Sequence, residues 1–160
     1  MVDLRASEAL IMFSEMAVGP PGTPLRSRLM DAGWRETSSG LRREWRQGDI
    51  VAIQFGQGEH AFLEATLEIA WPDYPKSLTS EEQLAEDFEI RFRTTLAQVG
   101  RRLGGPAFVG TYGDEGLPEN INAVIIALWP MSSAVLSLDF KHEDAGLPFR
   151  ITTTWSPGRL

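Results

Sequence analysis

Residues 80–103, SEEQLAEDFEIRFRTTLAQVGRRL, contain the longest regular pattern in the chain and decide its fold class. Acidic residues gather near the start of this stretch, whereas Arg101 and Arg102 lie near its end, which is the order that the helix dipole favours. The Gly-Gly-Pro sequence at 104–106 is a strong stop signal. The stretch therefore predicts a long amphipathic helix, with an apolar face that recurs every three or four positions at Leu84, Phe88, Phe92, Leu96, Val99 and Leu103.

Shorter segments with strand-like patterns lie on both sides of this helix. Residues 61–71 alternate between apolar and polar side chains, which is typical of a strand in a sheet with one covered face. Residues 121–129 are almost wholly apolar, as in a central strand. Because short turns join the segments, neighbouring strands are expected to pair antiparallel. The other expected strands are a polar edge hairpin with its turn at 38–40, residues 49–55 with Val51, Ile53 and Phe55 on one face, a brief segment at 107–112, and residues 134–141 and 147–155.

A long helix with one apolar face must cover a face of a sheet. We therefore predict an α+β two-layer sandwich, in which an antiparallel sheet of about six strands carries the 80–103 helix on one face. N-terminal helices are expected within residues 4–17 and 24–32, and the 160 residues are expected to form a single domain, 1–160. The residues expected to be buried are Leu84, Phe88, Phe92, Leu96, Leu67, Ile69, Val124, Ile126, Leu136 and Leu138, with Trp71, Trp129 and Trp155 at strand ends.

The composition limits the classes of function. The chain has no cysteine, which excludes disulfides, thiolate nucleophiles and Cys-ligated zinc, and fits a reducing cytoplasm. Its net charge of −7 disfavours nucleic-acid binding and favours encounter with a basic protein. The first 19 residues are interpreted as an amphipathic helix rather than a signal peptide, and no apolar run is long enough to predict a membrane span.

Residues 138–149, LDFKHEDAGLPF, contain the most suggestive cluster of polar residues, since His142 lies beside Glu143 and Asp144. We interpret residues 142–146 as the loop between two alternating strands, with Gly146 at a position that requires positive φ. A zinc site needs three or four convergent ligands, which the turn alone does not supply. The second histidine, His60, lies in a different turn, and a site shared by the two histidines remains an alternative.

No catalytic or cofactor-binding motif occurs in the chain. There is no G-x-S-x-G nucleophile elbow, no G-x-x-x-x-G-K-[ST] loop and no G-x-G-x-x-G loop. We therefore predict no catalytic, cofactor or metal-binding residue, no cofactor, and a protein that is not an enzyme. Two rival hypotheses are a hydrolase built from carboxylates with His60 or His142, and a small-ligand carrier with an apolar cavity between sheet and helix.

The last 70 residues resemble a family of uncharacterised small actinobacterial cytosolic proteins. The shared pattern is a helix ending in Leu-Gly-x-Pro, a further glycine and a strand ending in tryptophan; the matching residues here are Leu103, Gly104, Pro106, Gly110 and Trp129, with Gly105 as an extra residue. Some members look like immunity proteins that protect against toxins. The resemblance implies a binding role of this kind and no catalytic residue.

These observations together favour an acidic, cytoplasmic protein-binding module, and an immunity-type inhibitor of a toxin is the candidate form of such a module. A basic protein such as a toxin domain is the expected partner, and neither nucleic acid nor a membrane is expected to bind. Opposite charges mainly accelerate association. The carboxylates expected to meet the partner are Glu64, Glu68, Asp114, Glu115 and Glu119.

Overall fold

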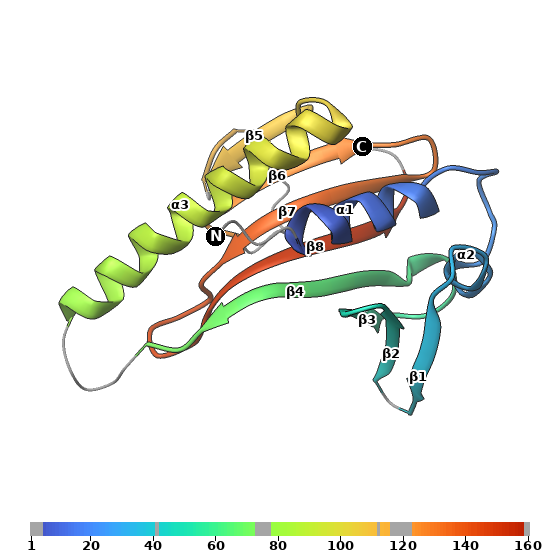
Figure 1. The fold of residues 1–160 in the computed structure, drawn as a ribbon, viewed down its shortest axis with the longest axis horizontal. Helices are drawn as coiled ribbons and strands as arrows, with labels where there is room; N and C mark the ends of the chain where they lie inside the picture. The colour runs from blue at the N-terminus through green and yellow to red at the C-terminus, as the bar shows by residue number, and fades with distance from the viewer. Residues whose placement is uncertain (1–4, 41, 73–77, 112, 116–122, 159–160) are drawn as a thin grey trace.

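The computed structural model describes residues 5–40, 42–72, 78–111, 113–115 and 123–158 (Figure 1). The strands form one antiparallel sheet in the order β1-β2-β3-β4-β8-β7-β6-β5. The elements in chain order are α1 (Arg5–Met16), α2 (Leu25–Asp31), β1 (Arg35–Ser39), β2 (Arg43–Gln47), β3 (Ile50–Phe55), the 3-10 helix η1 (Gly58–His60), β4 (Phe62–Ala70), α3 (Leu78–Leu103), β5 (Phe108–Thr111), β6 (Ile125–Pro130), β7 (Ala134–Lys141) and β8 (Phe149–Pro157).

The sheet consists of two four-stranded meanders that meet in its middle. Strands β1 to β4 pair consecutively, strands β5 to β8 do the same, and β4 pairs with β8 to join the two halves. The predicted α+β class, antiparallel pairing and long helix are confirmed. The expected number of about six strands was too low, because the polar hairpin at one edge and the short β5 at the other both pair along their length.

The main core lies between the sheet and the helices α1 and α3, which cover the same face (Figure 1). Phe88 and Phe92 of α3 are buried there, as the helical spacing predicts, and Leu136 and Leu138 of β7 are buried beneath the helices. The Phe88 ring lies 6.1 Å from the ring of Phe140 and 6.0 Å from that of Phe149, so aromatic contacts join α3 to the centre of the sheet. Leu67, Leu84 and Leu96 are partly buried against this core.

Strand β3 turns its most apolar side chains away from the helices. Trp45 of β2 is fully buried and is opposite Ala52, which places Ala52 and Ile50 on the helix-covered face. Val51, Ile53 and Phe55 do share a face, as predicted, but it is the opposite one, which we call the open face. Phe55 is 40% exposed there.

A bulge in β4 explains two wrong burial predictions. Thr66 is opposite Thr152, but the next paired residue, Glu68, is opposite Ile151, so Leu67 is an extra residue that reverses the alternation. Ile69 is therefore on the open face and is 54% exposed. Trp71, which follows the strand, is 66% exposed. Val124, which precedes β6 and was also expected in the core, is 38% exposed.

A second, smaller core lies on the open face at the β5 end of the sheet. Ile126 and Leu128 of β6 are buried there with Ala123, against the partly buried Phe108 and Val135. Ile126 is thus buried as predicted, although on the face that α1 and α3 do not cover.

Candidate functional site

Polar side chains form a row across the middle of the open face, on β4, β8 and β7. Alternation along β7 places Ser137, Asp139 and Lys141 on the face opposite Leu136 and Leu138. The neighbouring strands contribute further polar side chains to the same face, namely Glu64, Arg150, Thr152 and Thr154.

Asp139 is the most perturbed titratable group of this row. It is 2% exposed, and its Oδ2 accepts hydrogen bonds from the hydroxyls of Ser137 (2.8 Å) and Thr152 (3.3 Å). Burial raises the pKa of Asp139 to about 6, although the positive charge of Lys141 and the hydrogen bond from Ser137 act in the opposite direction. Nothing in the sequence pattern indicates that this face closes over the carboxyl group.

Ion pairs enclose Asp139. Glu64 of β4 lies 2.8 Å from the Lys141 ammonium and 3.3 Å from the Arg150 guanidinium, and the latter also contacts Glu143 at 2.6 Å. The side chains of Glu64, Lys141 and Arg150 are at most 20% exposed. This arrangement can hold a proton near neutral pH on an almost fully buried carboxyl group, and Ser137, which donates to it, is 4% exposed.

The turn interpretation of residues 142–146 is confirmed, but the His142 side chain is only 21% exposed. Gly146 has φ of +79°, the left-handed region that the turn needs. The His142 ring stacks on Phe149 with centroids 3.9 Å apart, and its Nε2 lies 3.3 Å from Glu81 of α3. His142 Nε2 makes no hydrogen bond within the described residues, so this contact becomes an ion pair only when the imidazole is protonated.

His60 belongs to a different environment. Its side chain is 87% exposed and lies 3.9 Å from Glu59, its neighbour in η1. Within the described ranges, no contact joins His60 to His142, and no group of three or more His, Asp or Glu side chains has a metal-binding arrangement.

The structure distributes the predicted partner-binding carboxylates over different surroundings. Glu64 lies in the ion-pair cluster described above, and Glu68 is held by Arg91 of α3 at 2.7 Å, a hydrogen bond that raises the pKa of Arg91. Asp114 and Glu115 are exposed, and Asp114 Oδ2 accepts a hydrogen bond from the Thr111 amide. Glu119 lies outside the described residues.

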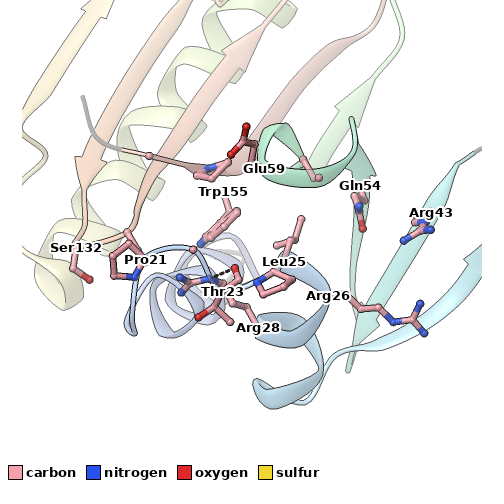
Figure 2. Close-up of a pocket in the computed structure, with 17 residues that line it drawn as sticks. Pro21, Thr23, Leu25, Arg26, Arg28, Arg43, Gln54, Glu59, Ser132 and Trp155 are labelled. Atoms are coloured by element: carbon pink, nitrogen blue, oxygen red, sulfur yellow. Dashed lines mark hydrogen bonds between the residues drawn. The ribbon is translucent and has the colours of Figure 1, made fainter.

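A cleft on the helix side of the sheet was not predicted. It has a volume of about 540 Å³ and lies between the α1–α2 loop, the β3–β4 turn and the end of β8 (Figure 2). We call it the arginine cleft, because Arg26, Arg28 and Arg43 all line it, whereas Glu59 is its one acidic lining residue. Its lining residues are scattered between positions 21 and 158, so no local motif could indicate it. The available signal was regional: residues 24–47 hold six arginines and three acidic residues in an otherwise acidic chain.

Hydrogen bonds fix one wall of the arginine cleft. Arg28 is 7% exposed and donates to the carbonyl oxygens of Met16 (3.0 Å), Pro20 (2.6 Å) and Thr23 (3.2 Å), which hold the α1–α2 loop. The hydroxyl of Ser133 donates to the carbonyl oxygen of Ala17 at 2.8 Å and ties the same loop to the sheet.

The open face carries an apolar patch at the β3–β4 end of the sheet. Phe55 and Phe62 are opposite each other on these strands, and their rings stack with centroids 5.2 Å apart. Val51 and Ile53 continue the same face and are partly exposed. We call these four residues the open-face patch.

Comparisons with models of protein families, with curated proteins and with solved structures gave no significant match to the chain. Within the described residues, no helix has the length and apolar character needed to cross a membrane.

Proposed function

We propose that the protein is a non-enzymatic binding module that recognises another protein through the open-face patch. The observation that carries this proposal is the stacked pair of Phe55 and Phe62, which are 40% and 37% exposed on neighbouring strands. Aromatic side chains supply large contact areas and have few rotamers to immobilise, which makes them common anchors of protein interfaces. A sheet holds such anchors in fixed positions before binding.

The surroundings of the patch indicate the chemistry of the partner. A hollow of about 370 Å³ adjoins it and is lined by Val51 and Ile53 together with Arg42 and Glu44. Arg46 lies opposite Val51 in the sheet register, is also exposed, and contacts Glu44 at 3.8 Å. An apolar centre with arginines at its rim complements a partner surface that is apolar in the middle and acidic at the edge.

An immunity-type inhibitor of a toxin is the second candidate function, and it rests on the sequence resemblance. A basic toxin would need a different surface of this protein. The exposed carboxylates Glu82, Glu86 and Asp87 of α3 offer such a surface, on the opposite side of the molecule from the patch. The non-enzymatic character is supported by the closure of Ser137 and Asp139 beneath ion pairs and by the separate surroundings of the two histidines.

The test is affinity capture from the native cell, followed by titration of the captured protein with variants. Phe55→Ala combined with Phe62→Ala should weaken binding by about tenfold or more, as expected for aromatic anchors. Ile90→Ala is the matched control, since Ile90 is 63% exposed on α3 and should be neutral. Circular dichroism confirms that both variants fold.

Two outcomes would contradict the proposal. The double variant could bind as tightly as the wild type. Alternatively, Glu82→Gln combined with Glu86→Gln could abolish binding while the phenylalanine variant retains it, which would identify a basic partner on α3.

A further inference from the structure

We propose that the arginine cleft binds a small organic anion, which combines an apolar body with one carboxylate, sulfonate or phosphate group. This site is separate from the open-face patch, because the cleft opens on the helix side of the sheet (Figure 2). Its volume of about 540 Å³ lies within the range of small-molecule pockets.

The charge of the cleft is unbalanced. Arg28 is almost completely buried, yet its three hydrogen bonds go to backbone carbonyl oxygens and no carboxylate pairs with it among the described residues. Arg43 is exposed and has no ion pair or hydrogen bond to another described side chain. Arg26 contacts Glu36 at 3.4 Å, and the one acidic lining residue, Glu59, is 91% exposed and solvated. An anionic group in the cleft would therefore gain charge-assisted contacts with little competition from the protein.

One residue of the cleft lining, Trp155, carries an unpartnered hydrogen-bond donor. The Nε1 atom of Trp155 is buried and has no hydrogen-bond acceptor in the described part of the chain, and the residue as a whole is 2% exposed. Figure 2 shows Trp155 among the lining residues, between Leu25 and the loop residue Pro21. A buried donor without an acceptor is unfavourable, so a ligand oxygen that accepts this hydrogen would correct the deficit. Because the atom is closed to water here, a lining side chain must rotate when the ligand enters.

The rest of the lining selects an apolar body. Apolar groups form much of the wall, because the lining includes the Trp155 ring and Pro21, Pro24, Leu25, Ala61 and Pro157. The Arg28 hydrogen bonds keep the α1–α2 part of this wall in place before binding, which reduces the entropy cost of ordering it. Arg28 is thus a positioning residue, whereas Arg43 and Trp155 are the expected contacts of the anionic group.

The test compares two probes of equal size, 2-naphthoate and its neutral amide, by isothermal titration calorimetry of the full chain. Naphthoate should bind at least about tenfold more tightly than the amide. Arg43→Gln should lower the affinity for naphthoate by about the same factor. Arg102→Gln is the matched control, because Arg102 is exposed at the end of α3 and should leave binding unchanged. Inorganic phosphate should bind more weakly than naphthoate, because it lacks the apolar body.

Amide and indole NMR spectra give a second readout. The indole N–H signal of Trp155, assigned from its loss in Trp155→Phe, should shift on addition of naphthoate, and this variant should bind more weakly while keeping the buried ring. The variant with alanine at Phe55 and Phe62 should bind naphthoate normally, which separates this proposal from the protein-binding one. Equal affinity for acid and amide, no binding of either, phosphate binding as tight as naphthoate binding, or an unaffected Arg43→Gln would overturn the proposal.

Discussion

Glu64 on β4 and Lys141 on β7 form a 2.8 Å ion pair that reaches across the intervening strand β8. On β8, Glu64 is opposite Thr154 and Lys141 is opposite Arg150, so Thr152 lies between the two ends of the ion pair. Thr152 is 0% exposed, and so the pair closes over the residue that donates to Asp139. This explains how a carboxyl group is buried on the face that α1 and α3 leave uncovered.

The raised pKa of Asp139 predicts a specific pH dependence of stability. Its pKa is about 6 in the folded state and near 3.8 in the unfolded chain, so folding favours the protonated carboxyl group. The stabilisation from this group is fully present at pH values below its unfolded-state pKa and is lost as the pH rises through its folded-state pKa. The free energy of unfolding changes by roughly 3 kcal/mol over this range. Asp139→Asn keeps an acceptor for Ser137 and Thr152 but removes the titration.

The measurement for Asp139 is urea unfolding of both proteins from pH 4 to pH 8. The free energy of unfolding of Asp139→Asn minus that of the wild type should rise with pH between the two pKa values and then stay constant. Other groups titrate equally in both proteins and cancel in this difference. A difference that is flat across this range would show that Asp139 ionises at its ordinary pKa.

Glu64 supplies the second prediction. Glu64→Gln leaves Lys141 and Arg150 without their shared carboxylate in a mostly buried cluster, so the free energy of unfolding should fall by about 1–3 kcal/mol. Glu59→Gln is the control, because Glu59 is 91% exposed and its substitution should change stability by less than about 0.5 kcal/mol. Equal urea midpoints for the two variants would mean that the ion pair contributes nothing.

The long helix and the antiparallel sheet could be predicted from the sequence because each depends on a local period. Phe88 and Phe92 recur at helical spacing, and the alternation in β7 correctly separates Leu138 from Asp139. The same reasoning fails at β4, because a single inserted residue at the bulge reverses the side of every residue that follows, including Ile69. A bulge has no sequence period of its own.

The arginine cleft depends on contacts between segments far apart in the chain, and the open-face patch depends on which face of β3 the helices cover; the pattern of a single strand contains neither. Phe55 and Phe62 have apolar side chains that would also fit the core. The burial of Trp45 opposite Ala52 shows that Ala52 faces the helices, and Phe55 and its partner Phe62 therefore lie on the other face. Arg28 and Trp155 are 127 positions apart in the sequence, yet both line the arginine cleft. Arg28 looks like an ordinary polar helix residue until its three carbonyl acceptors are known.

His142 and Gly146 give the third prediction. Because His142 stacks on Phe149 and lies near Glu81, His142→Ala should lower the free energy of unfolding by about 1–2 kcal/mol. His142→Phe keeps the stacking and should recover most of that loss. Gly146→Val should cost about 1 kcal/mol or more, because its φ of +79° strains a β-branched residue.

Thermal unfolding with added zinc or a chelator completes the experiment on this turn. Neither addition should move the melting temperature, since a metal bound only by the folded state would raise it. If His142→Phe were as unstable as His142→Ala, the imidazole itself, and not the ring contact, would be the important feature.

Two glycines with opposite surroundings supply the last prediction. A Cβ atom at Gly110 of β5 would lie 2.5 Å from the Phe108 ring, so Gly110→Ala must displace that ring from the small core on the open face. The expected cost is about 1–3 kcal/mol, as for other substitutions that overpack a core. Gly100 lies inside α3, and a Cβ atom there meets nothing within 4 Å, so Gly100→Ala should stabilise the protein by about 0.5–1 kcal/mol. The melting temperature and the urea midpoint should therefore fall for Gly110→Ala and rise for Gly100→Ala. A Gly110→Ala variant as stable as the wild type would show that Phe108 repacks without cost.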